Sequence, residues 1–155
     1  MTHEPSLPAL IGTAENALRA LLTRTLSTTR IKSYPAWVVL NAASAADARN
    51  ASTGRRRGAG DAPEISAGDA LRGAGDALKV DAGVVDEVLA QLAADGLVGA
   101  GGSLTALGAA ELRAARSAVA GTTARLVEGV GEADGAATRR VLEHVRRTAE
   151  DLLSL

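Results

Sequence analysis

The stretch from Val80 to Gly108 constrains the fold more than any other part of the chain. Its first half has apolar residues at helical spacing, namely Val85, Val88, Leu89 and Leu92. Gly96 follows at a position where glycine commonly ends a helix. Two short apolar segments, 97–98 and 103–105, then flank a glycine-rich turn, a pattern typical of a β-hairpin. The stretch therefore predicts a helix, a small hairpin at about 97–105 and the start of another helix.

Helical periodicity continues on both sides of this stretch. Leu and Ala dominate the apolar stripes, and Pro35 occupies a first-turn position ahead of a short apolar helix. A weaker helical pattern interrupted by glycines covers 65–78. The clearer patterns predict helices over 9–30, 36–43, 106–130 and 136–153.

Residues 44–64 interrupt the periodicity. This segment contains glycines, Pro63 and the Arg-rich run at 54–58, and it predicts a long mobile loop. Long loops in compact domains are usually functional or disordered. The arginines would be suited to an anion, although a solvated linker is the more ordinary interpretation.

The order of helices and hairpin resembles the MarR family of winged-helix proteins over nearly the whole chain. The segments that carry the resemblance are IGTAENALRALL, YPAWVVLNAA and LTALGAAELRAARSAVAGTTARLVEGV, with TRRVLEHV near the end. The resemblance implies a mainly α fold with a small β-hairpin wing, a winged helix-turn-helix within a MarR-like homodimer. It implies one domain over 1–155, with dimerisation and pocket helices at 9–43 and 106–153 and the winged-helix part at 65–105.

The part that should meet DNA in such a fold has the wrong charge. Residues 80–112 contain no Lys or Arg and five acidic side chains, namely Asp81, Asp86, Glu87, Asp95 and Glu111. Winged helices hold DNA largely through cationic contacts to phosphate. The sequence therefore argues against DNA as a partner, and a ligand-responsive MarR-type transcriptional regulator is the alternative function.

The aromatic residues point to a different site. The chain has one Trp, one Tyr and no Phe, and Trp37 and Tyr34 lie three residues apart. The resemblance implies a pocket between the first, second and fifth helices, where Asn41, Arg113 and Arg116 would also fall. The predicted function is a homodimer that binds a small, partly apolar organic molecule there, with DNA reading lost. The competing interpretation is that Trp37 only fills the core.

No motif identifies a catalytic site. Glu15, Tyr34 and His144 are the candidates for acid–base chemistry, but they belong to no recognisable constellation, so the catalytic residues are unknown. The chain has no Cys and only two His, so neither a metal nor another cofactor is expected. Any reaction would be cofactor-free. A dimeric accessory protein that binds another protein is a third possibility.

No segment has the features of a secretory signal or a membrane span. The longest apolar runs fall short of the roughly 18 residues that a transmembrane helix requires. The sequence therefore predicts a cytoplasmic protein with no membrane partner.

Overall fold

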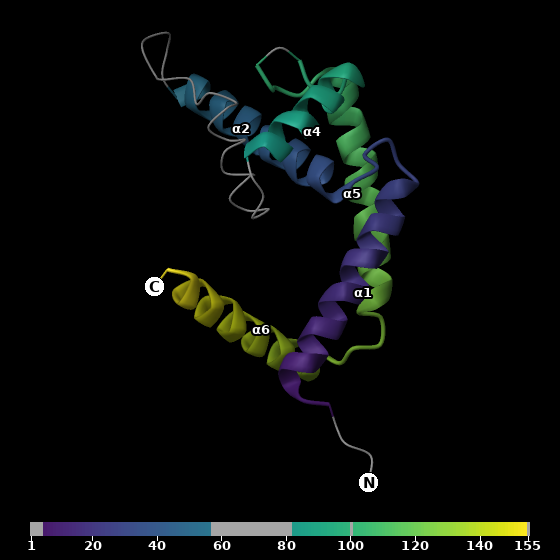
Figure 1. The fold of residues 1–155 in the computed structure, drawn as a ribbon, viewed down its shortest axis with the longest axis vertical. Coiled ribbons are helices and arrows are strands. Elements are labelled where there is room, and N and C mark those ends of the chain that lie inside the picture. The colour runs from purple at the N-terminus through teal and green to yellow at the C-terminus, as the bar shows by residue number, and fades with distance from the viewer. Residues whose placement is uncertain (1–4, 57–81, 100, 155) are drawn as a thin grey trace. The chain divides into compact units, whose positions relative to one another are not determined.

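The computed structural model describes residues 5–56, 82–99 and 101–154. The helices in this part of the chain are α1 (Leu7–Ser27), α2 (Tyr34–Arg56), α4 (Ala82–Ala94), α5 (Ala106–Leu126) and α6 (Glu132–Leu153) (Figure 1). The predicted helices at 9–30, 36–43, 106–130 and 136–153 are therefore confirmed as helices, with shifted ends. The weak helix predicted at 65–78 lies outside the described residues. The chain divides into two compact units, Met1–Ala120 and Gly121–Leu155.

The second helix is longer than predicted. Residues 44–56 were expected to begin a mobile loop, but α2 continues through Arg56, so that prediction is wrong for this part. The segment contains many alanines, which have the highest intrinsic helix propensity but give only a faint apolar stripe. Ala46 in this segment is 2% exposed and follows Ala43, which is 1% exposed, so the buried side of α2 continues past residue 43 with small side chains. The remainder of 44–64 lies outside the described residues.

The predicted β-hairpin wing is absent. Between α4 and α5, the described residues contain one isolated antiparallel bridge, Val98 to Leu104, and no strand. Gly101 and Gly102 have φ of 91° and 81°, so they form a turn and offer no side chains for cross-strand pairing. The structure therefore corrects the predicted fold class: apart from this bridge, helices are the regular secondary structure of the described residues, and a winged helix is not supported.

The hydrogen bonds of Thr105 explain why the chain does not continue as a strand after Leu104. Its hydroxyl accepts a hydrogen bond from the Gly108 amide at 2.9 Å, as an N-cap residue does, so α5 begins at once. The same hydroxyl lies 2.7 Å from the Gly96 carbonyl oxygen, to which it donates. Asp47 on α2 also reaches this connection, where its carboxylate accepts from the Leu104 amide at 3.1 Å. These contacts join the end of α4, the start of α5 and the second half of α2.

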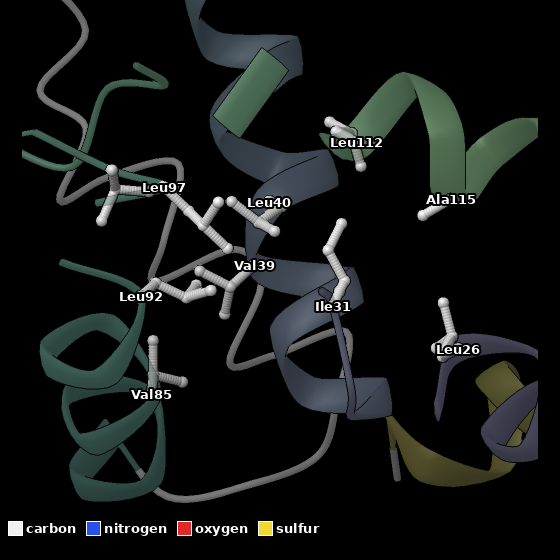
Figure 2. Close-up of a cluster of buried hydrophobic side chains, with 10 residues drawn as sticks. Leu26, Ile31, Val39, Leu40, Val85, Leu92, Leu97, Leu112 and Ala115 are labelled. Atoms are coloured by element: carbon white, nitrogen blue, oxygen red, sulfur yellow. The ribbon is translucent and has the colours of Figure 1, made fainter. Parts of the chain in front are cut away.

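The core of the first unit is a Leu/Val cluster around α2, which packs against both α1 and α4. Figure 2 shows Val39, Leu40, Leu92 and Leu97 pointing toward one another, with Leu112 and Ala115 contributed by α5. The buried members are Leu26, Ile31, Val39, Leu40, Val85, Leu92, Leu97, Val98, Leu112 and Ala115. Burial of these apolar side chains is the main favourable term in holding the first unit together.

Candidate functional site

Three of the predicted site residues lie on the first two turns of α2. Tyr34, Trp37 and Asn41 are spaced at i, i+3 and i+7, which places them along one side of a helix. Ser33 begins this helix, because its hydroxyl accepts from the Ala36 amide at 3.3 Å. The rigid start of α2 therefore fixes the backbone that carries the only two aromatic residues.

Trp37 and Tyr34 differ in their surroundings. Trp37 is half-buried and packs against the core cluster, while Tyr34 is 39% exposed. The indole thus contributes to the core and leaves part of its surface in solvent. The competing interpretation of Trp37 as a core residue accounts for its inner side and leaves its outer side unexplained.

Asn41 connects α2 with α5. Its side-chain oxygen accepts two hydrogen bonds from Arg116, from Nε at 2.9 Å and from Nη2 at 2.7 Å. Its amide nitrogen donates to the Trp37 carbonyl oxygen at 2.8 Å. Because both the oxygen and the nitrogen of its side-chain amide are hydrogen-bonded, Asn41 is held in one orientation. Asn41 in turn orients the Arg116 guanidinium.

The partner of Arg116 in this contact carries no charge. An amide oxygen is a neutral acceptor, and in the described part of the chain no carboxylate pairs with Arg116. A guanidinium has five N–H groups, and Asn41 occupies two of them. Arg116 is exposed, so the remaining N–H groups are open to solvent beside the α2 surface.

Arg113 is less closely connected to this group. It lies on α5 three residues before Arg116 and is exposed. Among the described contacts, none joins Arg113 to Tyr34, Trp37 or Asn41. The structure therefore brings Asn41 and Arg116 together, places Trp37 one turn before Asn41 and Tyr34 one turn before Trp37, and leaves Arg113 one turn before Arg116 on α5.

An ion pair that the sequence did not indicate joins the α1–α2 connection to α5. Arg30, in the connection between α1 and α2, has its Nε 4.0 Å from a carboxylate oxygen of Glu111 on α5. At this separation and exposure the pair contributes little to stability, about 0–1 kcal/mol. It could not have been found from the sequence, because neither residue belongs to a motif and they are far apart in the chain.

The candidates for acid–base chemistry have ordinary surroundings. Glu15 is exposed and forms an ion pair with Arg19, one turn later on α1, and His144 is exposed on α6. Over the described residues, no group of three or more His, Asp or Glu side chains is arranged to hold a metal ion. In the same residues, no helix is both long and apolar enough to span a bilayer.

The surface of α4, the helix expected to read DNA, has no cation. Asp86 and Glu87 are exposed, and Gln91 donates to the Asp95 carboxylate at 3.1 Å. No Lys or Arg occurs within Ala82–Ala94. The exposed polar surface of α4 is therefore acidic, as the sequence indicated.

Comparison with known proteins adds no identification. No protein-family model matches the chain, and no curated protein matches it. The resemblance to the MarR family therefore stays a prediction from the quoted segments.

Proposed function

We propose that the protein is a homodimer that binds a small, partly apolar organic molecule beside Trp37 and Tyr34, and that it does not read DNA. The observation that carries this proposal is the Asn41–Arg116 contact, which holds a guanidinium against the helix that carries the only indole of the chain. Binding sites for small molecules combine apolar walls with a few fixed polar groups. Here Trp37 and Tyr34 provide the aromatic surface and Asn41 and Arg116 the fixed polar groups.

Support for the dimer comes from apolar side chains that the chain leaves in solvent. On α1, Leu7, Leu10 and Leu18 are exposed, the last to 51%, and Leu26 is the only buried residue of this helix. A row of leucines along the exposed part of one helix commonly marks a protein–protein contact. A second copy of the chain would cover such a row in the symmetric manner typical of homodimers.

Ligand binding is tested by fluorescence titration. Because Trp37 is the only Trp, a bound planar molecule is expected to quench or shift an emission that reports this site alone. The titration uses a panel of bicyclic aromatic compounds and their saturated, non-planar counterparts. Aromatic faces favour the planar members, by about 0.5–1.5 kcal/mol for a good stack.

Variants separate the site from the rest of the surface. For a planar compound that binds, Tyr34→Phe is expected to weaken binding, and Arg116→Met to weaken it about tenfold or more, because a hydrogen bond to a charged group is lost. Arg125→Met is the matched control, since Arg125 is an exposed arginine near the end of α5. If Trp37 emission stays unchanged by every compound that binds the protein, the ligand site lies elsewhere and this proposal fails.

Duplex DNA is expected to bind only weakly at physiological salt. Proteins of this size that read DNA specifically reach about 10⁻⁸ M or better, largely through cations facing phosphate. The acidic surface of α4 opposes such binding. A gel shift over a salt series with genomic fragments measures this. A nanomolar complex whose affinity falls steeply with salt would contradict the prediction and favour the regulator alternative.

A further inference from the structure

We draw no further inference here: the strongest candidate, the row of exposed leucines on α1 (Leu7, Leu10 and Leu18), already supports the proposed homodimer, and nothing in the described residues shows how a second copy would lie against it.

Discussion

Gly108→Ala is expected to destabilise the first unit by roughly 3 kcal/mol or more, enough to unfold much of it. Gly108 is buried at the start of α5, where the backbone of Leu97 passes directly over it. A methyl group there would overlap the Leu97 carbonyl oxygen and lie 2.8 Å from its carbonyl carbon. Neither backbone can move away easily, because Leu97 is itself in the core and its carbonyl accepts from the Thr105 amide at 3.2 Å.

Urea unfolding followed by circular dichroism measures this effect, and Gly121→Ala is the matched control. Gly121 lies within the same helix, and a methyl group added there meets nothing within 4 Å. The control is therefore expected to stabilise the protein by about 0.5–1 kcal/mol, since alanine favours helix interiors over glycine. Equal midpoints for Gly108→Ala and the natural chain would show that α5 does not approach Leu97 as described.

Leu112→Ala is expected to cost about 2–5 kcal/mol of unfolding free energy. Leu112 is 1% exposed and joins α5 to the core cluster around α2 (Figure 2). The core contains no aromatic side chain apart from the inner part of Trp37, so no large neighbour can fill the space that Leu112 leaves.

Leu107→Ala is the control for Leu112→Ala. Leu107 lies on the same helix but is 40% exposed, so its loss is expected to cost less than about 1 kcal/mol. The comparison is read from chemical denaturation midpoints at constant slope. A difference of less than about 1 kcal/mol between the two variants would contradict the assignment of α5 to the core.

Helices were predicted correctly where large apolar residues repeat at helical spacing. Helix was not predicted where the buried residues are alanines. The Leu stripe of 9–30 and the Val/Leu stripe from Val85 to Leu92 correspond to α1 and α4. The second half of α2 was missed because the one buried side chain among its described residues is Ala46, and a segment with so small an apolar signal barely differs in pattern from a polar, alanine-rich loop. A periodicity test that counts alanine as apolar in alanine-rich segments would have extended α2.

The wing was predicted for a different reason. Segments 97–98 and 103–105 have strand-like composition, but strand formation depends on partners, and the glycines between them supply no side chains. Thr105 then serves as a helix cap, which composition cannot distinguish from a strand residue. A resemblance to a winged-helix family strengthened the expectation without adding any physical support for a strand.

At the candidate site, the sequence located the α2 residues through their local spacing but could not determine the contact across helices. Tyr34, Trp37 and Asn41 are close in sequence, so a single helix accounts for their grouping. Which of Arg113 and Arg116 meets Asn41 depends on how α5 crosses α2, and that depends on core packing around Leu112 and Ala115. Local sequence patterns do not determine how α5 crosses α2 or which of its side chains then faces Asn41.

The side chain at position 41 affects both the stability of the contact between α2 and α5 and the charge that Arg116 presents to solvent. An aspartate there, reachable from asparagine by one nucleotide change, would join α2 to Arg116 through a charge-assisted pair and would tighten the scaffold. The same change would neutralise the guanidinium and remove its attraction for anything outside the protein. Selection for ligand binding would retain asparagine, because it orients the guanidinium and leaves its charge in place. Selection for stability alone would favour aspartate.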